Sequence, residues 1–114
     1  MPKVHYQFEY DIFEEVSLLP PHDRQLVEDS RKAAHTAYAA YSGFKVGAAA
    51  RLQNGVILTG TNQENASYSL GLCAERVAIF AAGANHPGKK VIAMAITAHS
   101  SQFRIDRPIA PCGA

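Results

Sequence analysis

The sequence predicts an α/β protein, arranged as a three-layer α/β/α sandwich around a mixed sheet. Three observations support this class. Apolar residues recur with helical spacing over residues 23–40, two apolar runs flank the turn pair Asn54-Gly55, and a continuous apolar run covers residues 91–96 after a second helical segment. The order helix, strand, strand, helix, strand, followed by a helix start at Pro111, is typical of helices covering a sheet.

Composition places the chain among ordinary globular proteins. It has 114 residues, of which 47% are hydrophobic and 18% charged, enough for one domain with a single core. The net charge is +1, and runs of Lys or Arg do not exceed two residues, so we expect neither nucleic acid nor a membrane as partner. Without a signal peptide or a long apolar stretch, we expect a cytoplasmic protein with reduced cysteines. A Cys73–Cys112 disulfide is the disfavoured alternative.

Residues 1–20 are expected to form an N-terminal arm, and residues 21–114 the domain itself. The alternation of Val4, Tyr6, Phe8 and Tyr10 favours an edge strand or an arm lying on the body. Pro20-Pro21 closes this segment.

The first helix is expected over residues 23–40, with Asp23 as its N-cap. Its many alanines indicate close packing against a sheet or another helix. The positions that follow helical spacing are Leu26, Ser30, Ala33, Ala34, Ala37 and Tyr41.

After a turn at residues 41–43, a strand is predicted over residues 44–52. Asn54-Gly55 is a strong hairpin signal because both residues accept positive φ, and the partner strand is expected over residues 56–62. A second helix follows over residues 73–84, then a turn at Pro87-Gly88. The apolar run 91–96 predicts a central strand covered on both faces, and residues 98–110 a loop.

Two cysteines at two helix starts suggest a metal site. Cys73 opens the second helix and Cys112 follows Pro111. The helix dipole and unpaired N–H groups favour a thiolate there, and Glu75 lies in the same first turn. Such a set predicts zinc that activates water beside a proton-carrying carboxylate. The plainer alternatives are a buried small cysteine and an acid that only complements the dipole.

Four ordered segments carry a specific resemblance. They are Tyr41-Ser42-Gly43-Phe44-Lys45-Val46-Gly47-Ala48-Ala49, Asn62-Gln63-Glu64-Asn65-Ala66-Ser67, Cys73-Ala74-Glu75-Arg76 and Pro111-Cys112-Gly113-Ala114. From about Tyr38 onward the chain resembles the small, all-cysteine zinc type of cytidine deaminase. Members of that family are usually homotetramers whose subunits share active-site residues, and the resemblance implies the same here.

The resemblance also implies a role for each matching residue. Cys73 and Cys112 would be zinc ligands, and Glu75 would protonate N3 of cytosine and the departing ammonia while hydroxide attacks C4. Arg76 would donate to a ligand sulfur and offset the charge of the thiolates. It could instead be a solvated helix residue.

Substrate contacts are implied in the same way. Asn62 and Glu64 would hydrogen-bond the ribose hydroxyls, since their i, i+2 spacing near a strand end puts them on one face. Phe44 would pack on the nucleoside, and Ala74 is placed with these substrate-binding residues. The alternatives are loop caps for the two polar residues and an ordinary core position for Phe44.

The chain departs from the family pattern at its end. The family motif continues Pro-Cys-x-x-Cys, which would put the third zinc ligand at position 115, after Ala114. The last strands of the family's five-stranded sheet would also be missing. Because an unfinished core is hard to keep folded, we expect the protein to continue past Ala114; a genuine fragment is the alternative.

The expected activity is hydrolytic deamination of cytidine and 2′-deoxycytidine in pyrimidine salvage. Two other hypotheses stay open: deamination of another aminopyrimidine nucleoside, such as blasticidin S, and a metal-free, non-catalytic fragment of the fold. Editing of nucleic acid is disfavoured because neither the charge nor a His-type first ligand supports it.

Overall fold

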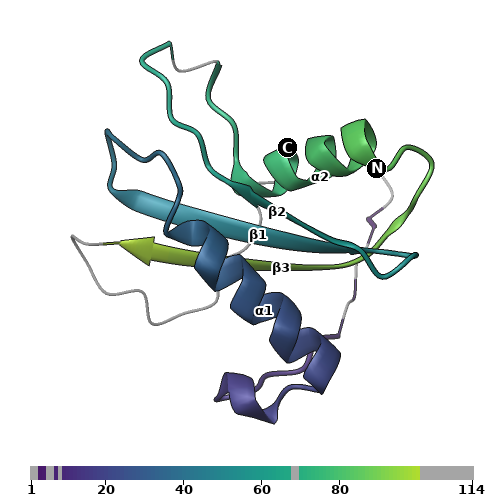
Figure 1. Cartoon of the computed structure of the whole chain (residues 1–114). Helices are drawn as coiled ribbons and strands as arrows, with labels where there is room; N and C mark the ends of the chain where they lie inside the picture. The colour runs from purple at the N-terminus through teal and green to yellow at the C-terminus, as the bar shows by residue number, and fades with distance from the viewer. Residues whose placement is uncertain (1–2, 5–6, 8, 68–69, 101–114) are drawn as a thin grey trace.

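The centre of the fold is the nine-residue strand β1 (Phe44–Leu52), which has a partner strand on each side. The computed structural model describes residues 3–4, 7, 9–67 and 70–100. Strand β2 (Ile57–Thr61) and strand β3 (Val91–Ser100) both pair with β1 in antiparallel fashion, giving the order β2-β1-β3 (Figure 1). The parallel pair of the expected mixed sheet is therefore not among the strands described.

Two helices cover opposite faces of this sheet, which confirms the three-layer sandwich. Helix α1 (Pro21–Ala34) lies over Gly47, and helix α2 (Ala74–Asn85) lies over Gly60, the residue paired with Ala48. Side chains of successive strand residues point to opposite faces, and paired residues share a face. Gly47 and Ala48 therefore face different helices, as the positions of α1 and α2 in Figure 1 illustrate.

Both helices approach the sheet closely because a glycine lies beneath each of them. A Cβ on Gly47 would collide with the backbone of Ser30 and Ala34, and one on Gly60 with the backbone of Ala74 and Ala78. The absence of a side chain at these two glycines therefore allows each helix to lie this close to the sheet.

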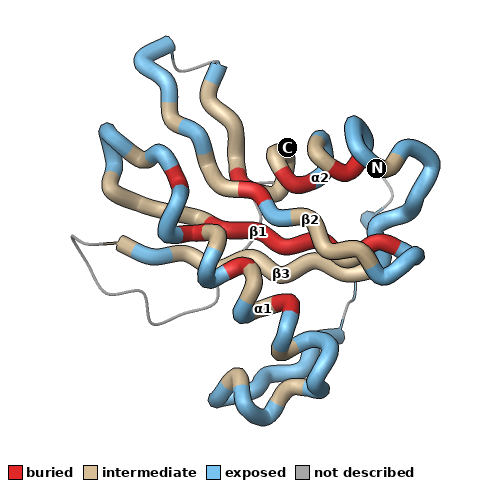
Figure 2. The backbone as a smooth tube through the Cα atoms, viewed as in Figure 1, coloured by how far each residue is buried: buried red, intermediate tan, exposed pale blue. Residues whose placement is uncertain are grey.

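The core consists mainly of alanine. The buried cluster between α2 and the sheet contains Ala48, Ala50, Ala74 and Ala78, with partly buried Val46, Met94 and Ile96 packed against it. Figure 2 shows the buried residues along β1 and on the sheet-facing sides of both helices. The prediction that alanines mark close packing is confirmed.

Helix α1 is shorter than expected and begins earlier. It starts at Pro21, with Pro20 as N-cap, and its C-cap is His35, so the predicted extension to residue 40 is wrong. Proline at the first helical position has a suitable φ and lacks only an N–H that would be unpaired there. Asp23 lies in the first turn, where it complements the helix dipole instead of capping. Beyond Ala34 the chain turns toward Asn62, which accepts a bond from the Tyr38 N–H at 3.2 Å.

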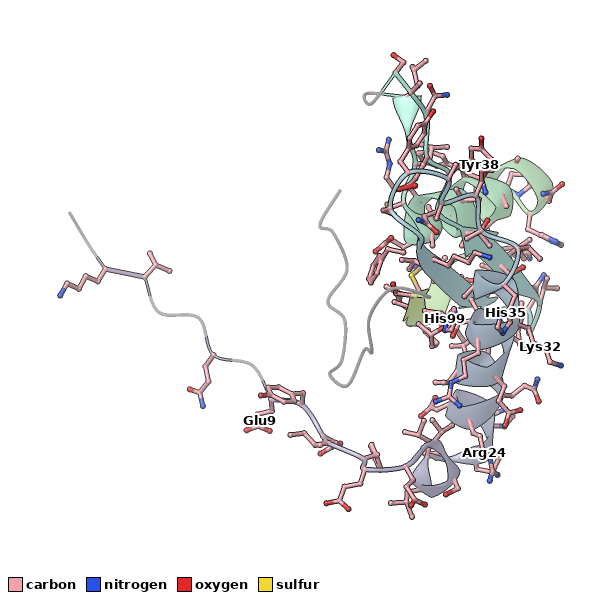
Figure 3. The ribbon with its side chains drawn as sticks, turned by 90° about the vertical axis from the view of Figure 1, so that its left-hand side faces the viewer. Glu9, Arg24, Lys32, His35, Tyr38 and His99 are labelled. Atoms are coloured by element: carbon pink, nitrogen blue, oxygen red, sulfur yellow. The ribbon has the colours of Figure 1, made fainter. Side chains whose placement is uncertain are left out.

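Strand β3 differs from its prediction in length and place. It continues to Ser100, because residues 97–100 pair with residues 44–47 of β1, so the loop expected over residues 98–110 is wrong for residues 98–100, and the rest of it lies outside the described residues. His99 also meets His35 at the end of α1, with ring centroids 5.9 Å apart (Figure 3). β3 is an outer strand of the described sheet, and β1 is the central one.

The predicted hairpin at Asn54-Gly55 is confirmed, with one change. Gly55 has φ of 86°, whereas no described residue other than glycine has a positive φ. The Gly55 N–H donates to the Leu52 carbonyl at 2.9 Å, and Leu52 N–H donates to the Val56 carbonyl at 2.8 Å. This is the three-residue loop in which a turn is followed by one left-handed glycine.

The remaining described elements are helix α2 and the N-terminal arm. Helix α2 begins one residue after Cys73, its N-cap, as predicted within a residue. The described residues of the arm contain the short 3-10 helix η1 (Val16–Leu18) and no strand, and Figure 3 shows Glu9 well apart from the sheet. Among the described helices, none combines the length and apolarity needed to cross a bilayer.

Candidate functional site

A pocket of about 490 Å³ opens where the end of β2 meets the start of α2. It brings together three residues that the sequence nominated, namely Asn62, Glu64 and Cys73. Gln63, between Asn62 and Glu64, lines the pocket too, so the argument that their spacing puts these two residues on one face stays a prediction. The full lining is Tyr41, Asn62, Gln63, Glu64, Asn65, Ala66, Gly71, Leu72 and Cys73.

Backbone pairing at Gln63 explains why these distant segments meet. Gln63 and Leu72 exchange two hydrogen bonds, at 2.8 and 2.9 Å, in an antiparallel bridge. On the other side, the Glu64 N–H donates to the Tyr38 carbonyl at 2.9 Å. The segment after β2 is therefore held from both sides, and the next residue after Leu72 is Cys73. Tyr38 lies beyond the end of α1 in Figure 3.

The Asn62 amide extends the hydrogen bonding of the sheet with its side chain. Its Oδ1 accepts from the Val46 N–H at 2.8 Å, and its Nδ2 donates to the Phe44 carbonyl at 2.9 Å. These two bonds fix the amide orientation and leave one donor hydrogen and one acceptor position for another partner. The loop-organising role that was an alternative is therefore present, and contact with ribose stays a prediction.

The Glu64 carboxylate is held by three hydrogen bonds from one turn. Its Oε1 accepts from the Tyr41 N–H at 3.0 Å and the Ser42 N–H at 3.1 Å, while its Oε2 accepts from the Ser42 hydroxyl at 2.7 Å. The Ser42 hydroxyl bond, followed by the Ser42 N–H bond, lowers the pKa of Glu64 below its ordinary 4.5; the Tyr41 N–H bond adds to this, and desolvation partly opposes it. The group is ionised at neutral pH.

This lowered pKa predicts an acid-sensitive contribution to stability. A carboxyl whose pKa is lower in the folded state stabilises the fold above its unfolded pKa, and the contribution disappears as pH falls through the folded pKa. We expect Glu64→Gln to be less stable than the parent at pH 7, and the difference to shrink below the ordinary value of 4.5. Urea unfolding from pH 7 to pH 3 measures this. A difference independent of pH would contradict the assignment.

The start of α2 provides the thiol and the acid. Cys73 is half-buried at the N-cap and lines the pocket, and Glu75 lies in the first turn. The positive end of the helix dipole favours the thiolate, the form that binds a metal. As one sulfur donor lining the pocket, Cys73 fits zinc. Cys112 lies outside the described residues, and within those residues no cluster of three His, Cys, Asp or Glu side chains suits a metal ion.

Four other predicted residues, Glu75 among them, are not part of the pocket lining. The Ala74 side chain is fully buried in the core, so only its backbone remains for a substrate contact. Phe44 is half-buried on the sheet face covered by α2, two residues before Val46. The Arg76 guanidinium lies 5.4 Å from the centroid of the Phe80 ring, one turn along α2.

The sequence reasoning did not single out the groups that hold Glu64. Tyr41 and Ser42 were recognised only as a turn within a matching segment. Two of the three donors are backbone N–H groups, which carry no side-chain signal. The Ser42 hydroxyl was the one signal that could have been found, because serine in a turn before a strand commonly bonds nearby backbone.

Comparison with known proteins agrees with this fold. Residues 20–114 match the family model described as the cytidine and deoxycytidylate deaminase zinc-binding region. A match over that much of the chain defines the class of protein, so the chain belongs to this family. The zinc-binding description of the matched region supports zinc as the cofactor.

Individual relatives point the same way. The chain is 43% identical over 93 residues to a cytidine deaminase of Halalkalibacterium halodurans and 40% identical over 90 residues to one of Sporosarcina psychrophila. These matches cover 81% and 79% of this chain, and 66% and 62% of the relatives, so the chain spans less than two thirds of either.

Solved structures are similar over the same region. The cytidine deaminase of Burkholderia pseudomallei matches with a TM-score of 0.70 and 43% identity, over 83% of this chain and 70% of that one. The enzyme of Mycobacterium tuberculosis matches with a TM-score of 0.67 and 36% identity, over 78% and 68%. The α/β fold expected from the sequence is thus that of solved cytidine deaminases.

Proposed function

We propose that the protein is a zinc-dependent hydrolase that deaminates cytidine and 2′-deoxycytidine to the uridines, in pyrimidine salvage. One observation carries the proposal: the pocket places Cys73, at the positive end of α2, beside the polar pair Asn62 and Glu64. A nucleoside needs both kinds of recognition, a polar grip on the sugar and a reactive centre at the base. Relatives named cytidine deaminase support the same substrate class.

The polar pair would hold the sugar. Each of the two side chains keeps unused hydrogen-bonding capacity after its internal bonds, one donor and one acceptor on Asn62 and one acceptor on Glu64 Oε2. Vicinal hydroxyls can donate to the carboxylate oxygen and to the amide oxygen. Because both groups are already fixed by the protein, little orientation entropy is lost on binding. Phe44 and the Ala74 backbone would contact the rest of the nucleoside.

Glu75 would carry protons during the reaction. Water that attacks C4 must lose one proton on attack and its second when the C4 hydroxyl becomes the carbonyl, while N3 and then the leaving amino group must each gain one. A carboxylate in the first turn of α2, two residues from Cys73, can serve all four transfers and end in the form in which it began.

Cys73 and Cys112 would hold the zinc ion, with the Arg76 guanidinium compensating the thiolate charge. When bound, zinc lowers the pKa of water so that hydroxide is available near neutral pH.

Removal of the metal gives a direct test. The absorbance of cytidine is expected to fall in the presence of the zinc-loaded protein, to stay constant after a chelator has removed zinc, and to fall again when zinc is restored. Mg²⁺ should not restore activity, because it prefers oxygen ligands and thiolates do not suit it. Cys73→Ala should lower the zinc content measured by native mass spectrometry. Zinc-loaded protein that leaves cytidine unchanged would overturn the proposal.

The proposal includes a cytoplasmic homotetramer. Apolar side chains on the outer side of α2 support association, since Ile79 is 46% and Phe80 53% exposed in the single chain. The same native mass spectrum reports the number of subunits.

A further inference from the structure

The Ser42 hydroxyl lies at a junction between two parts of the site. It donates to Glu64 Oε2 at 2.7 Å and accepts from the Phe44 N–H at 3.1 Å. The first bond reaches the segment after β2, and the second reaches the first residue of β1. The Ser42 side chain therefore connects Glu64 and Phe44, two of the residues expected to contact the nucleoside. Ser42 itself is not part of the pocket lining.

The same bonds decide which carboxylate oxygen can serve a ligand. Glu64 Oε1 already accepts two backbone N–H groups, so both of its in-plane acceptor positions are used. Among the described residues, the Ser42 hydroxyl alone donates to Oε2, which leaves one acceptor position on this oxygen. The oxygen available to an incoming hydroxyl is thus the one whose position Ser42 fixes.

We propose that Ser42 is a positioning residue for sugar recognition: its hydroxyl aims Glu64 Oε2 at the substrate's ribose hydroxyls and locks that carboxylate to the start of β1. This inference rests on the proposed nucleoside deaminase function. Ser42 acts through Glu64 and touches neither the base nor the reacting atoms.

The geometry predicts a selective defect in the Ser42→Ala variant. Oε1 keeps both of its backbone donors, so the carboxylate stays in place at that end, while Oε2 loses its only internal partner and can rotate away from the sugar. A misdirected charge-assisted hydrogen bond is expected to raise KM for cytidine about tenfold. Because the groups at the start of α2 are untouched, kcat should change less than about twofold.

The experiment compares KM and kcat for cytidine and for 2′,3′-dideoxycytidine, which lacks both ring hydroxyls. Ser42→Ala should raise KM for cytidine only, and Ser42→Thr, which keeps the hydroxyl, should restore it. Ser17→Ala is the matched control, because Ser17 also donates to a glutamate carboxylate, Glu15 Oε2 at 3.3 Å, but lies on the arm. Equal effects of Ser42→Ala on both substrates, or no effect on KM, would overturn the proposal.

A second measurement does not depend on turnover. Carboxyl titration by NMR should show the pKa of Glu64 rising toward 4.5 in Ser42→Ala and unchanged in Ser17→Ala. An unchanged Glu64 pKa in Ser42→Ala overturns the positioning role whether or not cytidine is a substrate. If the pKa rises as expected while the parent protein leaves cytidine unchanged, the deaminase assignment fails, and the sugar-positioning role fails with it.

Discussion

Replacing Glu75 by glutamine is expected to lower kcat for cytidine by about 10²- to 10⁴-fold, the range typical of general acid–base groups. Glutamine has nearly the same shape but neither takes nor releases a proton at neutral pH. All four proton transfers proposed for the reaction pass through this one carboxylate, so we expect a loss in the upper part of that range. KM should change little, because the proposed sugar contacts lie on Asn62 and Glu64, which line the pocket.

The control for this variant is Glu28→Gln on α1. Glu28 is exposed on the helix that covers the other face of the sheet, so its charge is removed far from the pocket. Zinc content should be the same for both variants within error, and Glu75→Gln should lower the free energy of unfolding by no more than about 0.3–1 kcal/mol, the interaction with the helix dipole. A Glu75→Gln protein with kcat within a few-fold of the parent would exclude the proton-carrying role.

Placing an alanine at Gly47 or Gly60 is expected to lower the free energy of unfolding by about 3 kcal/mol, the upper part of the usual range for overpacking. The new methyl group would meet helix backbone in each case, Ser30 and Ala34 above Gly47 and Ala74 and Ala78 above Gly60. Backbone cannot rotate aside as a flexible side chain can, so a whole helix must shift. The melting temperature should fall by roughly 4–8 °C for each kcal/mol in a domain of this size.

Gly83→Ala provides the opposite case within α2. A Cβ on Gly83 would have nothing within 4 Å, and the residue lies inside the helix. Alanine there should raise the free energy of unfolding by about 0.5–1 kcal/mol, because glycine loses more conformational freedom on folding. Thermal and urea unfolding of the three variants tests the prediction. Equal stability of Gly47→Ala, Gly60→Ala and the parent would show that the layers are not held at the distance described.

Much of the fold could be predicted from local patterns. The bounds of β1, the hairpin at Asn54-Gly55 and the start of α2 after Cys73 were all placed within a residue, because periodicity and turn chemistry act over a few neighbours. The pocket could be predicted in part, since Asn62, Glu64 and Cys73 carry recognisable chemistry.

The errors arose where distant contacts decide the structure. Ala37 follows helical spacing and is buried, yet α1 ends at Ala34 because Tyr38 bonds the backbone of Asn62. Residues 98–100 were expected in a loop, yet they pair with residues 44–46 of β1, which is long enough to extend the strand. Similarly, the bonds to Glu64 come mostly from backbone N–H groups, which a sequence does not reveal.

The two-sided attachment of Gln63 links ligand binding to complete folding. The pocket walls come from residues 41, 62–66 and 71–73, and they meet only when Tyr38 and Leu72 both pair with the segment around Gln63. A partly folded chain that lacks either pairing has no pocket. A ligand should therefore bind only the fully folded protein and shift the whole unfolding transition by RT ln(1 + [L]/Kd). Amide hydrogen exchange should then slow by the same factor in both helices, including α1, which contributes no residue to the pocket.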